Sequence, residues 1–226
     1  LSSAMQNLIP FILTGSVVFF YNVFRSYIPQ LPDLTNISNY SFGMIGLVAA
    51  FMVGHQFMEK FRHPQYATTA GIVSICVLMM TLHPIGEKQG VYDLGRVGPT
   101  GILIGVLFGV AIGVIFHFYS KLNFLKNSSL PDFVANWINN IIPIFISLAL
   151  FATFIFAFKI DVFQVILNLF EPIQNFGQSL PGLILLVLIP AFFYSMGIST
   201  WLWTALQNPI FIAGIAANAL AVKNGG

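Results

Sequence analysis

Charged residues are scarce in this sequence. Lys and Arg together number 9 and Asp and Glu number 7 in 226 residues, so only 7% of the chain is charged and the net charge is +2. A soluble domain carries about 25% charged residues, so this chain cannot cover its surface with solvated groups. The small net charge gives no reason to expect nucleic acid as a partner. Because 57% of the residues are hydrophobic, the sequence predicts an all-α integral membrane protein surrounded by a lipid bilayer.

Cysteine and familiar catalytic motifs are also lacking. The single cysteine, Cys76, lies inside an apolar run, so no internal disulfide can form. The sequence has no metal-ligand spacing of His and Cys, no phosphate-binding glycine loop and no nucleophile elbow. It therefore gives no reason to expect a metal or a cofactor. His55 and His117 lie within apolar runs, where packing is favoured over a role in proton or substrate binding.

Long apolar runs separated by short polar loops are what the sequence has in abundance. A membrane-spanning helix needs about 20 largely apolar residues. The runs predict about six transmembrane helices, at residues 5–24, 41–58, 66–82, 98–119, 134–158 and 181–203. Loop charges do not set their orientation, because Lys and Arg divide equally between the two sides.

Two further apolar runs are shorter. Residues 163–170 end at Glu171-Pro172 and are expected to form an interfacial helix rather than a crossing. Residues 209–222 are too few to span and are expected to form a re-entrant half-helix, the arm of a hairpin. We expect both ends of the sequence to be cut from a longer chain.

Four glycines recur at every fourth position in the run at residues 98–119. They are Gly101, Gly105, Gly109 and Gly113. On a helix this spacing places all four on one face, where the backbone of a second helix can approach closely. The pattern predicts a helix-packing seam, either within one chain or between two chains.

Polar residues are concentrated near the end of the sixth predicted span. The stretch at residues 194–203 combines hydroxyls, aromatic rings and a glycine, and it is followed by two amides. Aromatic faces can stack on sugar rings while hydroxyls and amides form hydrogen bonds, so a sugar pocket is one interpretation. An aromatic belt at the membrane interface is the other. The candidate pocket residues are Tyr194, Ser199, Thr200, Trp201, Gln207 and Asn208.

Several short motifs, in order, resemble one transporter family. Pro10 with Gly15-Ser16, the Pro131-Asp132 segment up to Pro143, the Ser179-Leu180-Pro181-Gly182 segment and Asn208-Pro209 each match a family motif. The chain thus resembles the membrane-embedded IIC component of the sugar phosphotransferase system, in its lactose/cellobiose/chitobiose branch. The resemblance covers most of the chain and fits a truncated or divergent member.

The resemblance implies an architecture and a set of partners. Residues 1–160 would be a scaffold and dimerisation half with five transmembrane helices. Residues 161–226 would begin the sugar-transport half, with an interfacial helix, the sixth span and a hairpin arm. The implied protein is a multi-pass homodimer in the bacterial plasma membrane that translocates a disaccharide. A cytosolic IIB partner would then phosphorylate the sugar from a phosphocysteine.

The sequence departs from the family pattern where chemistry is expected. The family histidine falls on Ser199, the following glycine on Thr200, and an arginine on Asn136. A serine hydroxyl is a poor acceptor for the proton of a sugar hydroxyl. The family's hairpin glutamate would lie beyond Gly226. A second hypothesis is therefore a IIC-derived facilitator, sensor or partner-binding subunit without phosphotransfer, and it leaves open whether the chain takes part in catalysis.

Overall fold

The computed structural model describes residues 2–28, 30–83, 92–122, 131–195, 207, 210 and 211. Within these residues the chain is helical and has no β-strand, which confirms the all-α prediction. Four helical stretches are long and apolar enough to cross a membrane, namely Gln6–Arg25, Phe42–Lys60, Ile102–Ser120 and Val134–Ala157. They correspond to the first, second, fourth and fifth predicted spans.

The described helices follow one another with short connections. Eight are α-helical: α1 (Ser2–Tyr27), α2 (Thr35–Tyr40), α3 (Ile45–Lys60), α4 (Ala67–Met80), α5 (Ile102–Ser120), α6 (Asp132–Ala152), α7 (Val162–Gln178) and α8 (Leu180–Ser195). Short 3₁₀ turns are η1 (Phe42–Met44), η2 (Pro64–Tyr66), η3 (Leu94–Val97) and η4 (Pro99–Gly101), and η5 (Thr153–Ala157) is a π-helical turn. The third predicted span is represented by α4, which is shorter than a usual crossing.

The chain divides into two compact units. The first ends at Val162 and the second begins at Phe163. The boundary expected from the sequence, between residues 160 and 161, lies close to this division. Each unit is described by itself below.

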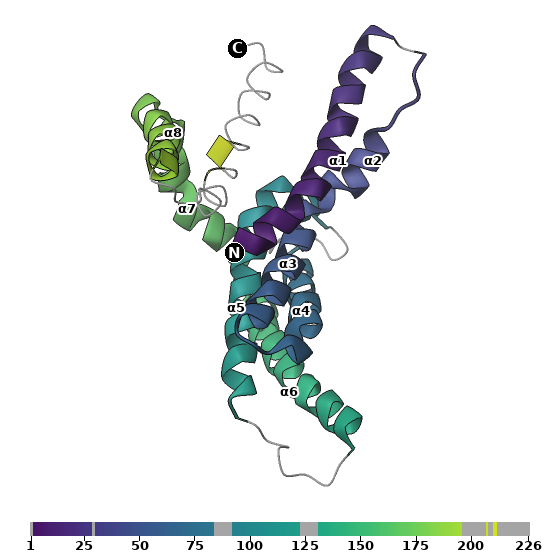
Figure 1. Ribbon diagram of the computed structural model, residues 1–226, viewed down its shortest axis with the longest axis vertical. Helices are drawn as coiled ribbons and strands as arrows, with labels where there is room; N and C mark the ends of the chain where they lie inside the picture. Colours follow the sequence, from purple (N-terminus) through teal and green to yellow (C-terminus); the bar gives the residue numbers. More distant parts are fainter. Residues whose placement is uncertain are drawn as a thin grey trace. The chain divides into compact units, whose positions relative to one another are not determined.

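Three helices form the core of the first unit, where α3 packs against α4 and α5 (Figure 1). The α3–α5 pair is parallel, because Gly46 near the start of α3 lies beside Gly101 at the start of α5, and Phe57 lies beside Gly113 further along. Helix α4 connects them and ends near the start of α5, so it runs in the opposite direction. Apolar side chains such as Ile104 and Ile112 are fully buried between these helices.

Two buried hydroxyls in this core, those of Ser74 and Thr81, are satisfied by the backbone of α4. Ser74 Oγ donates to the Ala70 carbonyl oxygen at 2.7 Å, and Thr81 Oγ1 donates to the Leu78 carbonyl oxygen at 2.7 Å. A hydroxyl in an apolar environment is costly when it has no partner, and a backbone carbonyl three or four residues earlier provides one. These contacts let a small polar side chain lie within an otherwise apolar helix.

Helix α6 ends in an unusual reversal of the chain. Pro143 lies within α6 and is fully buried, and the helix then widens into the π-helical turn η5. Lys159 follows with a φ of 51°, a left-handed conformation, and the Ile160 amide donates to the Phe154 carbonyl oxygen at 3.1 Å. A left-handed residue after a helix stops it and turns the chain back. The turn places Asp161 at the end of the core where α5 begins.

In the second unit the predicted break at Glu171-Pro172 is wrong, because α7 continues through both residues to Gln178. A proline inside a helix removes one backbone donor but leaves the other helical hydrogen bonds in place. The amphipathic pattern also continues past the proline, so the apolar face of α7 is not interrupted. Ser179 then begins α8, since its Oγ accepts a hydrogen bond from the Gly182 amide at 3.2 Å.

Candidate functional site

The pocket residues predicted from the sequence lie mainly outside the described part of the chain. This applies to Ser199, Thr200, Trp201 and Asn208. Tyr194 lies in the last turn of α8, and it is 73% exposed. Gln207 donates a hydrogen bond from Nε2 to the Leu186 carbonyl oxygen. The structure thus brings Gln207 to the side of α8.

Ile210 also packs in this region of the second unit. It is 4% exposed, and its side chain lies so close to Gly177 that a Cβ there would be 2.7 Å from Ile210 Cγ2. Gln207 thus contacts α8 and Ile210 contacts α7. Sequence reasoning placed Gln207 as a hydrogen-bonding candidate for a ligand, whereas here its amide nitrogen binds backbone.

Three of the four glycines predicted to form a packing seam lie against α3 of the same chain. A Cβ on Gly105 would be 2.5 Å from the Gly46 carbonyl oxygen, and one on Gly109 would be 2.9 Å from the Ala50 carbonyl oxygen. A Cβ on Gly113 would meet the Phe57 ring at 2.6 Å. Gly101 precedes α5 and faces the Arg96 carbonyl oxygen instead. Two helix backbones therefore approach closely along this row.

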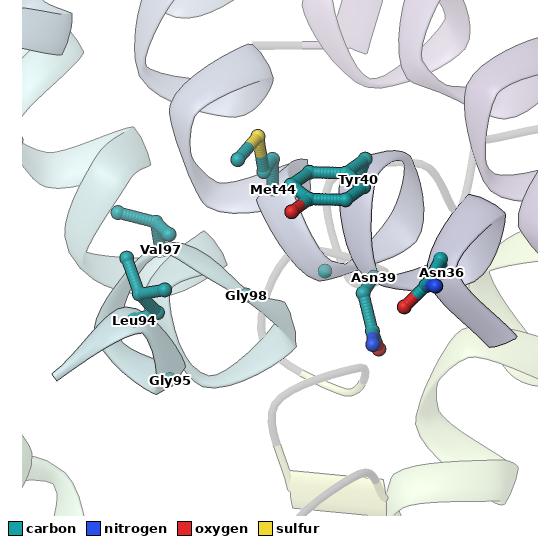
Figure 2. A pocket seen from close by; sticks show the side chains of 9 residues that line it. Asn36, Asn39, Tyr40, Met44, Leu94, Gly95, Val97 and Gly98 are labelled. Carbon is teal, nitrogen blue, oxygen red and sulfur yellow. The ribbon is translucent and has the colours of Figure 1, made fainter.

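A cavity of about 440 Å³ lies in the first unit, beside the end of the core where α3 and α5 begin. Figure 2 shows α2 and η1 on one side of it and the segment of η3 on the other. The lining residues are Asn36, Asn39, Tyr40, Gly43, Met44, Leu94, Gly95, Val97 and Gly98. Small-molecule sites are clefts of about 300–1,000 Å³ with an apolar lining and a few polar groups, and this cavity fits that description.

The polar side chains that the structure describes in the cavity lining come from α2. Asn36, Asn39 and Tyr40 stand at helical spacings of three and four residues, so they share one face of this short helix. Figure 2 shows the amides of Asn36 and Asn39 at one side of the cavity and the Tyr40 ring beside Met44. None of the lining residues within the described ranges is charged. The cavity therefore offers two amides, a phenol and apolar surface to a ligand.

One wall of the cavity is fixed by contacts within α2 and η1. Ser41 Oγ donates to the Ile37 carbonyl oxygen at 2.6 Å, and the Met44 amide donates to the Ser41 carbonyl oxygen at 3.0 Å. These bonds join the end of α2 to the start of α3. The opposite wall comes close to this one, since a Cβ on Gly98 would be 3.2 Å from the Gly43 carbonyl oxygen.

The opposite wall is held by Asp93 at the start of η3. Its Oδ1 accepts a hydrogen bond from the Gly95 amide at 2.9 Å. The Gly95 carbonyl oxygen accepts from the Gly98 amide at 3.1 Å and from Thr100 Oγ1 at 2.9 Å. Aspartate is a favoured cap because its carboxylate satisfies an amide that a helix start leaves unpaired. The wall is thus a fixed turn.

Arg96 anchors the same wall to two other helices. Its guanidinium donates to Asp161 in a bidentate pair, with Nη1–Oδ1 at 2.8 Å and Nη2–Oδ2 at 2.7 Å. Nη1 also donates to the Thr81 carbonyl oxygen at 2.8 Å, and Nε lies 3.6 Å from Asp93 Oδ2. The Arg96 side chain is only 8% exposed and that of Asp161 is 21% exposed. Such a pair is strongly directional because the planar guanidinium matches the two carboxylate oxygens.

Sequence reasoning missed both the Arg96 pair and the cavity. Asn36, Asn39 and Tyr40 lie in a stretch interpreted only as a loop, and Arg96 was counted only as a loop charge. A usable signal existed for the pair: Arg96 precedes one predicted span and Asp161 follows the next. Two consecutive crossings return the chain to the side from which it started. The two charges could therefore have been placed at the same end of the core from the sequence alone.

At the other end of the core, histidines pack among aromatic rings. The ring centroids of Phe61 and His117 are 4.6 Å apart, and those of His63 and His117 are 5.6 Å apart. His55 Nδ1 lies 3.8 Å from Glu59 Oε2 one turn further along α3. Within the described ranges, no group of three or more His, Cys, Asp or Glu side chains could hold a metal ion.

Comparisons with known proteins do not place the chain in a family. No family model matches it, no curated protein matches its sequence, and no solved structure matches its fold. The functional argument therefore rests on the residues and their arrangement.

Proposed function

We propose that the chain is a membrane-embedded sugar permease of the IIC type, in the lactose/cellobiose/chitobiose branch, and a divergent member of it. The observation that carries the proposal is the order of the motifs from Pro10 to Asn208-Pro209 along an apolar chain. The four membrane-length helices support it, because such a permease is an all-helical membrane protein. Its location would be the bacterial plasma membrane, with lipid around it.

The direction of two helices supports the proposed count of six crossings. Helices α3 and α5 are parallel neighbours, so their starts lie at the same end of the core. If both cross the bilayer, the chain must cross back between them, and α4 is the helix between them. We therefore assign α4 a crossing although its α-helical part has only 14 residues. With α8 as the remaining crossing, the count is six.

The second unit fits the start of a transport half. Helix α7 has apolar residues such as Phe163 and Phe170 on one face and polar ones such as Gln164 and Asn168 on another, the pattern of a helix lying in the membrane interface. Helix α8 leads into the stretch with the hydroxyls and aromatic rings. The proposed re-entrant arm at residues 209–222 lies mostly outside the described part of the chain.

In the proposed mechanism the chain positions a disaccharide, and the phosphoryl group comes from a phosphocysteine on the IIB partner. A sugar hydroxyl attacks the phosphorus, a P–O bond forms, the P–S bond breaks, and the thiolate leaves. The hydroxyl proton needs an acceptor. Ser199 stands at the family histidine position and serves poorly, so the acceptor would be supplied by another residue or by water.

A second candidate function is a IIC-derived membrane protein without phosphotransfer. The observation that favours it is the replacement of the family histidine and arginine by Ser199 and Asn136. Such a protein would act as a facilitator, a sensor or a partner-binding subunit. It would still require the sugar site but not the phosphoryl donor.

The test is uptake of radiolabelled cellobiose, chitobiose and lactose in a bacterial strain that carries matching IIA and IIB proteins. Phosphoenolpyruvate-dependent uptake that needs IIB and yields the sugar phosphate supports the permease. Uptake of unmodified sugar that is unaffected by deletion of IIB supports the facilitator instead. Ser199→Leu should abolish uptake by either route while leaving the amount of protein in the membrane unchanged.

A further inference from the structure

We propose that the cavity between α2 and η3 is a second binding site, for a neutral glycosyl group. It lies in the first unit and uses none of the residues at 194–208 that the sequence analysis assigned to the transported sugar. The inference stands on the cavity alone. It holds whether or not the chain takes part in phosphotransfer.

The polar side chains of the cavity are accessible to a ligand. Asn36, Asn39 and Tyr40 are exposed, and none of the three side chains hydrogen-bonds to another described residue, although neighbouring Ser41 does. Each amide can donate two hydrogen bonds and accept two, and the phenol can do both. A sugar hydroxyl likewise donates and accepts, so one sugar ring presents hydrogen-bond donors and acceptors that complement these three side chains.

The remaining lining favours a sugar over an ion. Among the described residues, no charged side chain lines the cavity, and against that lining an anion or cation would enter without compensation of its desolvation cost. The floor is apolar, from Met44, Leu94 and Val97. Sugar rings have C–H faces that pack on apolar and aromatic surface while their hydroxyls bind at the edge. The cavity likewise offers both kinds of surface, with polar groups on α2 and the apolar side chains of Leu94 and Val97 opposite them (Figure 2).

The site is also largely preformed. The η3 wall is held by Asp93 and by the Arg96 contacts to Thr81 and Asp161, which connect it to α4 and to the end of α6. A fixed wall loses little conformational freedom when a ligand binds, and more of the contact energy then contributes to affinity. The α2 side chains are exposed and supply the adaptable part.

A neutral glycosyl group could come from a free sugar or from the headgroup of a membrane glycolipid. The middle of α1 lies beside η1, since a Cβ on Gly15 would be 2.6 Å from Phe42 Cβ. The same helix presents exposed apolar side chains further along, including Phe20 and Phe24, which lipid can cover. A lipid headgroup is therefore one source to test. The experiment has one arm for each source.

The experiment is photocrosslinking with a diazirine-bearing cellobioside. The full chain is purified in a detergent without a sugar headgroup, because alkyl maltosides would compete, and it is reconstituted in phosphatidylcholine nanodiscs. We expect labelled peptides from residues 36–44 or 92–98, identified by mass spectrometry. Competition by free cellobiose identifies a free-sugar site, and competition only by glucosyl diacylglycerol in the nanodisc identifies a lipid headgroup site.

The variants make the assignment specific. The double variant Asn36→Leu, Asn39→Leu should reduce labelling of these peptides at least tenfold. If this double variant does not fold, the nearly isosteric Asn39→Asp should reduce labelling to the same extent. Gln65→Ala, which removes an exposed amide at the other end of the core, should leave labelling unchanged. Labelling confined to other peptides, or labelling unaffected by the variants, overturns the proposal. Lost uptake with retained labelling contradicts only the permease function.

Discussion

Arg96 and Asp161 are 65 residues apart in the sequence and form a bidentate ion pair in which both oxygens of the carboxylate are engaged. Asp161 directly precedes the end of the first unit at Val162. Arg96 lies within the wall of the cavity, between the lining residues Gly95 and Val97. A single contact therefore fixes the cavity wall and the point where the chain leaves the first unit.

Removal of the Arg96 side chain is expected to destabilise the first unit. In Arg96→Leu the largely buried Asp161 carboxylate and the Thr81 carbonyl oxygen lose their donor. Breaking one side of a buried pair leaves an uncompensated charge, and we expect a loss of about 2–4 kcal/mol. The midpoint of SDS-induced unfolding in mixed micelles measures it. The double variant Arg96→Leu, Asp161→Leu should recover part of the loss.

The chain contains a matched control for this experiment. Arg25 Nη1 lies 3.2 Å from Asp33 Oδ2, but the two side chains are 37% and 54% exposed. An exposed pair contributes about 0–1 kcal/mol because water screens it. Arg25→Leu should therefore shift the unfolding midpoint much less than Arg96→Leu. Equal shifts would contradict the role assigned to burial.

The sequence predicts features that depend on local composition better than it predicts contacts between distant segments. The apolar runs predicted the four membrane-length helices because helix formation in a bilayer depends on local composition and length. The row of glycines indicated a helix-packing face but could not name its partner. That partner, α3, is set by tertiary packing, which no local pattern contains.

The cavity and the Arg96 pair depend on contacts between distant segments. Asn36 and Asn39 lie in a polar stretch with prolines. Such a composition indicates a loop, but it does not indicate which distant segment the loop will pack beside. Pro172 was misread for a related reason. Proline weakens a helix locally, but whether the helix continues depends on the apolar face it keeps on both sides.

The glycine row should show a graded response to alanine. In Gly105→Ala the new Cβ would lie 2.5 Å from the Gly46 carbonyl oxygen, so the two helix backbones must separate. In Gly113→Ala the obstruction is the Phe57 side chain, whose ring has some freedom to move. We expect a loss of about 1–3 kcal/mol for Gly105→Ala and a smaller loss for Gly113→Ala. The same unfolding assay measures both variants.

Val114→Leu provides the control on α5. Val114 is 37% exposed, so a larger apolar side chain there should change stability little. A similar effect for all three substitutions would mean that α5 tolerates no change of side chain, and the close approach to α3 would not be the cause.

The turn between α3 and α4 should be improved by glycine. Arg62 lies just after α3 and has a φ of 63°. Its amide donates to the Glu59 carbonyl oxygen, and the amide of His63 donates to the Met58 carbonyl oxygen. This is the bonding of a Schellman motif, in which glycine is preferred. Arg62→Gly relieves the left-handed strain, and we expect a gain of about 0.5–1 kcal/mol. Gln56→Gly, inside α3, should lose about 1 kcal/mol under the same conditions.

The direction of the helices predicts which positions share a side of the membrane. In a Cys76→Ser background, single cysteines are placed at Lys60, the last residue of α3, and at Tyr92 and Lys121, which follow α4 and α5. Because α3 and α5 are parallel, positions 60 and 121 should react with a membrane-impermeant maleimide from one side and position 92 from the other. In intact protoplasts only cysteines on the outer side react. After permeabilisation all three should react, which controls for the intrinsic reactivity of each position.

The pattern of labelling decides the number of crossings. If α4 does not cross, positions 60 and 92 must react from the same side, whatever the orientation of the protein. If α4 crosses, its 14 residues provide about 21 Å of helix at 1.5 Å per residue. That is less than the roughly 30 Å of the hydrocarbon core. The short turns at its ends, η2 and the residues around Thr81, would then lie within the membrane, where neighbouring α3 and α5 shield their backbone groups from lipid.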